Sequence, residues 1–207
     1  MSNKTLIFVF GLVALAGCKA DKIEIDLTEK MLQSAKSGQE EMVSFEATFS
    51  TFGKLDDAQK AQVSAIENIL EDYIELEDFE LATTDMGFEV IIEGEFPVST
   101  DGTNSGAYFL HITQSDILKD YSLIQLKTGS SFDKMSTEMK AISFMLAPDA
   151  FHPTTFKIKG KGLDVIAIAA ENDGDAHLMW KGTVDGRESF KYDGGIFNKT
   201  GAGLFFK

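Results

Sequence analysis

The chain has 207 residues, 43% hydrophobic and 25% charged, a composition typical of globular proteins and not of disordered or collagen-like ones. Its 33 acidic residues outnumber its 19 basic residues, and the resulting net charge of −14 argues against nucleic acid as a partner, because an acidic surface repels phosphate. The single cysteine excludes an internal disulfide and any zinc or iron–sulfur site built from several cysteines.

The N-terminal segment has the layout of a secretory signal. A short start with one positive charge, on Lys4, is followed by an apolar stretch over residues 5–16. The next residues are Leu15, Ala16, Gly17 and Cys18, so two small residues precede the only cysteine of the chain. Small residues fit a peptidase cleft, and the cysteine thiol is a nucleophile that accepts a diacylglyceryl group.

This segment resembles the lipobox of bacterial lipoproteins, in which Leu and a small residue precede Gly or Ala and then Cys. The resemblance implies that residues 1–17 are a cleaved signal peptide and that Cys18 carries fatty acyl chains such as palmitate, which anchor the protein to a membrane. Lys19 follows the cysteine where inner-membrane lipoproteins of enteric bacteria carry Asp, which favours the outer membrane over the inner one. The alternative is a plain secretory signal with an accidental cysteine.

Residues 18–207 contain no repeat and no linker rich in Pro, Gly or Ser, so they are interpreted as one domain. The alternating pattern begins almost at once, which leaves Lys19–Lys22 as a tether of about 13–14 Å at full extension. The domain is therefore expected close to the membrane surface, in the periplasm or elsewhere in the cell envelope.

Apolar periodicity predicts the elements of this domain. In chain order, the pattern first predicts a strand at Lys22–Asp26, a helix capped by Asp26 and Glu29 that ends near Gly38, and a strand at Val43–Ser50 with Val43, Phe45, Ala47 and Phe49 on its core face. A second helix is capped by Asp56 and Gln59 and runs to about Leu76, with an apolar stripe of Val63, Ile66, Leu70 and Tyr73. A short strand at Phe79–Ala82 and a long strand at Phe88–Val98 follow, the latter with Phe88, Val90, Ile92 and Phe96 facing inward. Strands at Tyr108–Thr113 and Tyr121–Lys127 and a helix within Ser131–Leu146 come next.

The last sixty residues are expected to be strands. Hairpin turns are predicted at Asn172–Asp175 and at Asp185-Gly186, and the apolar run Leu163–Ala170 predicts a strand covered on both faces. Together the elements predict an α+β fold, a mostly antiparallel sheet with two or three helices packed on one face.

No catalytic or metal-ligating set is recognisable. His111, His152 and His177 lack a second ligand at metal-binding spacing and are interpreted as structural, and no Gly-x-Ser-x-Gly motif occurs. Gly201-Ala202-Gly203 lies too near the C-terminus to precede the helix that a phosphate loop requires. No cofactor and no metal are therefore expected.

Several clusters of residues have a functional and a structural interpretation. Asn172–Asp175 with Glu171 is interpreted as a turn, with a calcium site as the alternative. The acidic run from Glu67 to Glu80 is a solvated face or a docking face for a basic partner. Lys157, Lys159 and Lys161 protect an edge strand from aggregation or contact anionic lipid headgroups.

The strongest functional indication is apolar. The chain contains 17 Phe and 8 Met, and Met135, Met139 and Ile142 lie at helical spacing. Flexible Met beside Phe fills a core, or it lines a cavity for an acyl chain.

The sequence therefore predicts a lipid-anchored cell-envelope protein, an accessory protein without enzymatic activity that binds a protein or an envelope component. The alternatives are a carrier with a cavity for a lipid or another apolar ligand and, third, an envelope hydrolase with scattered residues. The opening Cys18-Lys19-Ala20, followed by a strand and a helix, also resembles small lipoproteins of proteobacteria and their phages, which implies a role in altering the host envelope.

Overall fold

The computed structural model describes residues 20–142, 148–170, 176–193, 197 and 201–207. Within these residues the strands are β1 (Lys22–Thr28), β2 (Met42–Phe52), β3 (Glu75–Thr83), β4 (Gly87–Ser99), β5 (Tyr108–Gln114), β6 (Ser122–Thr128), β7 (Thr154–Ala170), β8 (Ala176–Tyr192) and β9 (Gly203–Phe206), and the helices are α1 (Glu29–Lys36), α2 (Asp57–Glu71) and α3 (Phe132–Ile142).

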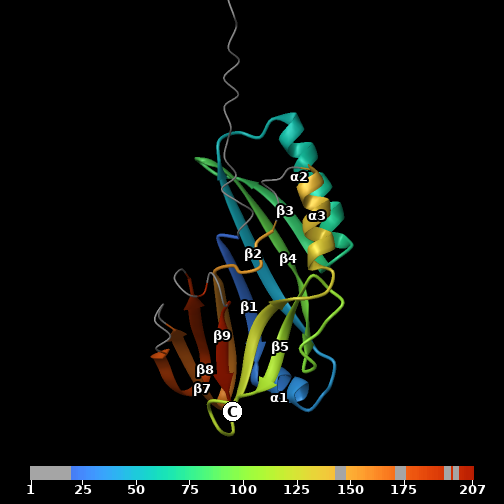
Figure 1. The fold of residues 1–207 in the computed structure, drawn as a ribbon. Helices are drawn as coiled ribbons and strands as arrows, with labels where there is room; N and C mark the ends of the chain where they lie inside the picture. The colour runs from blue at the N-terminus through green and yellow to red at the C-terminus, as the bar shows by residue number, and fades with distance from the viewer. Residues whose placement is uncertain (1–19, 143–147, 171–175, 194–196, 198–200) are drawn as a thin grey trace, which may run out of the picture.

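All of these strands belong to one sheet, which closes on itself (Figure 1). Its order is β1-β2-β4-β5-β6-β9-β7-β8, and a parallel pairing of β1 with β7 joins the two sides into a closed barrel of seven strands. β3 and β8 lie outside the ring, each paired to one barrel strand. The barrel interior holds the core, to which β1, β7 and β9 contribute the fully buried residues Ile25, Phe156 and Phe206.

The predicted α+β fold is therefore wrong. The protein is mostly β, with 52% of residues in strands, and the helices do not cover one face of an open sheet. α1 lies at one end of the barrel, whereas α2 and α3 cover the extended ends of β2, β3 and β4 (Figure 1). The error arose because closure depends on pairing residues 23–28 with residues 154–159, a contact that no local pattern encodes.

The strand β7 changes partners along one edge, and this shapes the barrel. β7 pairs with β1 over Thr154–Lys159 and with β9 over Val165–Ala167. Between these stretches the register with β8 shifts, and Gly162 adopts a φ of +86°, a backbone conformation that residues with a Cβ rarely adopt. β7 is consequently one bulged strand. Val165, Ile166 and Ala167 are buried, so both faces are covered over these three residues of the predicted run, whereas Ile168 is only partly buried.

Local signals in the sequence were confirmed or corrected one by one. The capping box of Asp56 and Gln59 starts α2, which ends at Glu71 rather than near Leu76. The first helix begins after Thr28, whose hydroxyl accepts from the Met31 amide, and not at Asp26, which lies in β1.

Asp185-Gly186 forms no hairpin turn, because both residues lie inside β8 opposite Gly160 and Lys161. The other predicted turn, residues 172–175, lies outside the described residues.

Tyr192 places a hydroxyl in the apolar core. Its ring is fully buried and packs edge-on against Phe156 and Phe197, and its hydroxyl has no hydrogen-bond partner among the described residues. Burial raises the pKa of Tyr192 well above its usual value, so the group is a neutral phenol at physiological pH.

Tyr192→Phe is expected to raise the free energy of unfolding by about 1 kcal/mol, because it removes a buried polar group that gains no hydrogen bond on folding. Chemical denaturation of the full chain measures the change. The matched control is Tyr108→Phe, which removes a hydroxyl that donates to the Asp149 carbonyl oxygen at 2.7 Å and should lower stability. Equal losses for the two variants would contradict this account of Tyr192.

Candidate apolar ligand site

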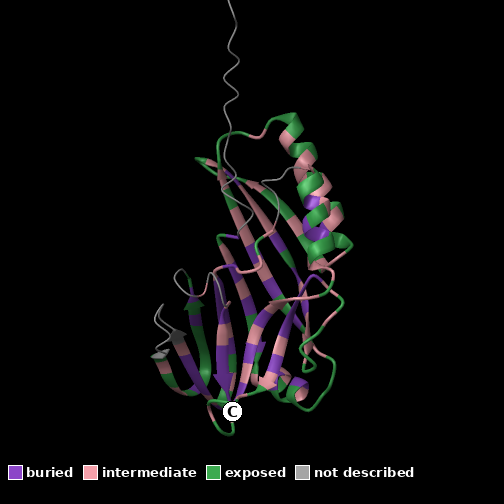
Figure 2. Ribbon diagram, in the orientation of Figure 1, coloured by how far each residue is buried: buried purple, intermediate pink, exposed green. Residues whose placement is uncertain are grey.

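The sheet opens where β4 leaves the barrel. β5 pairs with β4 only at Val98 and Ser99, because β3 occupies the same edge of β4 over residues 88–95. Beyond that point the inward-facing side chains of β2 and β4 have no opposite barrel wall. α2 and α3 cover them, and Figure 2 shows mostly intermediate and exposed residues here, in contrast to the buried barrel.

α2 faces the sheet without packing tightly against it. Of the predicted apolar stripe, Val63, Ile66 and Leu70 line the gap toward the sheet, whereas Tyr73 lies beyond the end of α2. Leu70 is the one buried residue of the helix. On the opposite wall, Phe49 and Val90 are likewise only partly buried. Two apolar surfaces thus face each other across a gap that neither fills.

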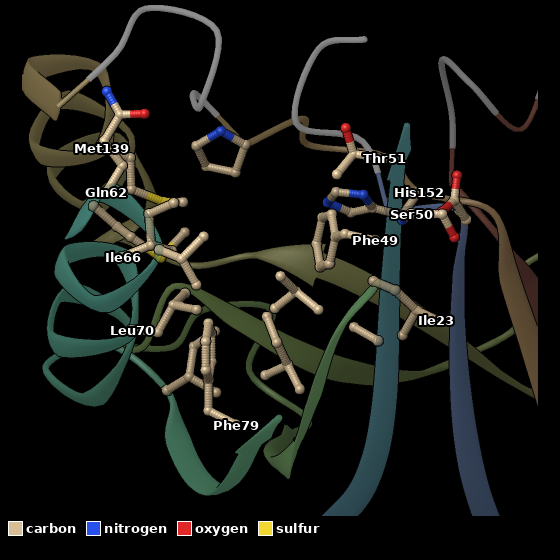
Figure 3. Close-up of a pocket in the computed structure, with 18 of the residues that line it drawn as sticks. Ile23, Phe49, Ser50, Thr51, Gln62, Ile66, Leu70, Phe79, Met139 and His152 are labelled. Atoms are coloured by element: carbon tan, nitrogen blue, oxygen red, sulfur yellow. The ribbon is translucent and has the colours of Figure 1, made fainter. Parts of the chain in front are cut away.

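This gap is a pocket of about 200 Å³ (Figure 3). An apolar cavity of about 150 Å³ in another protein is large enough to hold benzene. The apolar lining residues are Ile23, Phe45, Ala47, Phe49, Leu55, Val63, Ile66, Leu70, Ile74, Phe79, Phe88, Val90, Ile92, Phe96, Met135, Met139 and Pro148. Apolar walls of this kind accept hydrocarbon.

The labelled polar lining residues lie around one end of the pocket. Figure 3 shows Thr51 and Ser50 of β2 beside His152, and Gln62 of α2 across the pocket from them beside Met139, whereas Leu70 and Phe79 lie toward the other end. No Lys or Arg occurs among the described lining residues, and the acidic group present is Asp21. A ligand with a hydrocarbon tail and an uncharged polar head matches this distribution.

His152 fixes the start of the domain at this polar side. Its Nδ1 accepts the backbone N–H of Ala20 at 2.9 Å, and its Nε2 lies 3.1 Å from the Tyr108 hydroxyl. Because Nδ1 accepts, a neutral ring carries its proton on Nε2 and donates to Tyr108. Ala20 is buried as a result, so the chain is already held two residues before β1, and the predicted four-residue tether is too long.

The other histidines are separate from the pocket. His111 lies in β5 with its Nδ1 buried and without a partner among the described residues, and burial, with a smaller contribution from Lys127, lowers its pKa. His177 lies in β8, a strand that contributes no residue to the described lining of the pocket. The structure therefore does not bring the three predicted histidines together.

The lysine stripe has a structural role that the sequence did not reveal. Lys157 lies 3.1 Å from the carboxylate of Glu24 on the neighbouring strand, and Lys22 contacts the same carboxylate at 2.7 Å. β7 lies between β1 and β8 here, so the prediction of an edge strand is wrong.

Of the other predicted site residues, Met135 and Met139 line the pocket and Ile142 does not. Gly203 is the first residue of β9, so Gly201-Ala202-Gly203 leads into a strand. Leu15, Ala16, Gly17, Cys18 and the acidic turn at 171–175 lie outside the described residues. The alternating pattern predicted that Phe49, Phe88 and Val90 lie on the inner faces of their strands. Alternation shows which face points inward, but it does not show whether other side chains fill the space next to that face.

Three further observations bear on the site. In the part of the chain that the structure describes, no group of three or more His, Cys, Asp or Glu residues is arranged to hold a metal ion. Among the same residues, no helix is long and apolar enough to cross a bilayer. No protein-family model matches the chain, and a search of curated proteins found no match.

Proposed function

We propose that this chain is a lipid-anchored protein of the cell envelope that binds one hydrocarbon chain of a lipid in the pocket between α2 and the sheet. The observation that carries the proposal is the unfilled gap of about 200 Å³. The partly exposed Val63 and Ile66 line one side of this gap, and Phe49 and Val90 line the other. A soluble domain rarely leaves facing apolar walls unpacked, because each buried methylene contributes about 0.8 kcal/mol.

The pocket favours a ligand with an uncharged head. An anionic carboxylate would meet Asp21 and a net charge of −14, with no Lys or Arg among the described lining residues to balance it. Hydroxyl or ester groups, in contrast, form hydrogen bonds with side chains such as those of Gln62 and Thr51. We therefore expect a monoacylglycerol to bind more tightly than a fatty acid of the same chain length.

The anchor completes the proposal. Cys18, with Leu15, Ala16 and Gly17 before it, would carry the acyl chains, and the outer membrane is the proposed location on the basis of Lys19. Binding without chemical conversion is the proposed activity, so the protein would act as a carrier or a sensor of envelope lipid.

Native mass spectrometry of the full chain, purified from membranes in detergent, tests the proposal. We expect one non-covalently bound lipid per protein, or saturation by one equivalent of added monoacylglycerol. A protein that carries no lipid and takes up none would overturn the proposal. Turnover of the added ester into glycerol and fatty acid would instead support the hydrolase alternative.

A further inference from the structure

Two large apolar side chains are exposed together at the end of the sheet beside the pocket. Phe52, the last residue of β2, is 70% exposed and Met86, in the turn before β4, is 72% exposed. They lie close together, because Phe52 pairs with Gly87 and the Gly53 amide donates to the Met86 carbonyl oxygen at 3.0 Å. We call Phe52 and Met86 the apolar tip.

The apolar tip adjoins the pocket. Thr51, the residue before Phe52, lines the pocket, and so does Leu55 three residues after it. Another strongly exposed apolar residue, Ile117 at 82%, lies in the loop between β5 and β6, toward the opposite end of the barrel (Figure 1). Leu178 at 62% and Met179 at 44% are a second exposed apolar pair, in β8, a strand that contributes no pocket-lining residue among those described. The apolar tip differs from that pair in that it adjoins the pocket.

The chain also reaches the domain from the side of the apolar tip. β1 runs antiparallel to β2, with Lys22 opposite Thr48, and the Asp21 amide donates to the Thr48 carbonyl oxygen. The residues before β1 consequently enter from the end of β2 that carries Thr51 and Phe52. Ala20 is held there by His152, and Cys18 precedes it by two residues, a span of at most about 7 Å.

We propose that the apolar tip inserts into the membrane to which Cys18 is anchored, so that the pocket opens against the bilayer and takes its ligand directly from it. The partner is the lipid bilayer, which matches two exposed apolar side chains next to a short lipid-bearing segment. Insertion of the tip rests on the proposed anchor at Cys18 together with the exposure and the chain path, whereas loading from the bilayer rests in addition on the proposed ligand of the pocket.

Depth-dependent fluorescence quenching tests the insertion. The full chain with Trp180→Phe, which removes the single native Trp, receives either Phe52→Trp or, as a matched control, Ile117→Trp. Each protein is reconstituted into phosphatidylcholine vesicles that contain lipids with brominated acyl chains. We expect strong quenching at position 52 and none at position 117. Equal quenching at both positions, or none at 52, would overturn the proposal.

The loading step has its own measurement. The double variant Phe52→Ser and Met86→Ser should take up a fluorescent monoacylglycerol from vesicles roughly tenfold more slowly, because it lacks the inserted side chains, while Ile117→Ser matches the wild type. Equilibrium binding of the same probe in detergent should stay unchanged in both variants. Unchanged uptake from vesicles would overturn loading from the bilayer, whereas absent equilibrium binding in the wild type would overturn only the proposed function of the pocket.

Discussion

Val63→Phe is expected to weaken monoacylglycerol binding by about tenfold or more and, at the same time, to stabilise the fold. Val63 points from α2 into the pocket, so the larger ring takes space that the ligand needs. Excluding two methylenes of the ligand costs about 1.6 kcal/mol, slightly more than a factor of ten in the dissociation constant. The same ring buries apolar area in an unfilled space and should raise the free energy of unfolding by about 1 kcal/mol.

The opposite signs of these two effects make the test specific. A ring forced into an already packed core would lower stability by about 1–3 kcal/mol. Titration with a fluorescent monoacylglycerol and chemical denaturation measure both quantities on the same protein. Ser64→Phe, the same residue on the exposed side of α2, serves as the matched control and should leave binding unchanged. Val90→Phe on the sheet wall repeats the test from the other side.

If Val63→Phe and Val90→Phe both lower stability, the gap between α2 and the sheet is not a cavity in solution. If both raise stability and leave binding intact, the ligand binds elsewhere. Weaker binding with higher stability is the result that the pocket requires.

Cys18→Ser should abolish acylation of the protein completely. The thiol of Cys18 is the only one in the chain, so an oxygen in its place leaves no group for thioether formation. We expect palmitate labelling to disappear and intact mass spectrometry to show no chain that begins at residue 18 with an added diacylglyceryl group. Gly17→Ala is the matched control, because the lipobox accepts either residue and labelling should persist. Label retained in Cys18→Ser would contradict the proposed anchor.

Features set by neighbouring residues were predictable from the sequence. The capping box of Asp56 and Gln59 needs contacts three residues apart, and the alternation in β2 records which face is buried, so both were confirmed. The prediction failed where a remote partner decided the outcome. Asp185-Gly186 is a typical turn pair, but it is extended in β8 because Gly160 and Lys161 of β7 lie opposite.

For the pocket, too, the sequence predicted the local features but not how they pack together. The apolar stripe of α2, the Met pair of α3 and the inner face of β4 were all identified, yet each is equally compatible with a packed core. Whether these surfaces pack against each other depends on β3 displacing β5 from the edge of β4, which is a choice between the strands that precede and follow β4 in the chain.

The sequence by itself determined most of the local elements and the alternating faces, since these are set by adjacent or helically spaced residues, and the proposed anchor at Cys18 rests on the sequence alone. The tertiary structure alone decided that β1 and β7 close the sheet, that a cavity remains under α2, and that the N-terminus meets this cavity at His152. The closure and the His152 contact depend on pairings between residues more than one hundred positions apart, and the cavity depends on which strand pairs with β4, so their free energy arises only when the whole chain is folded.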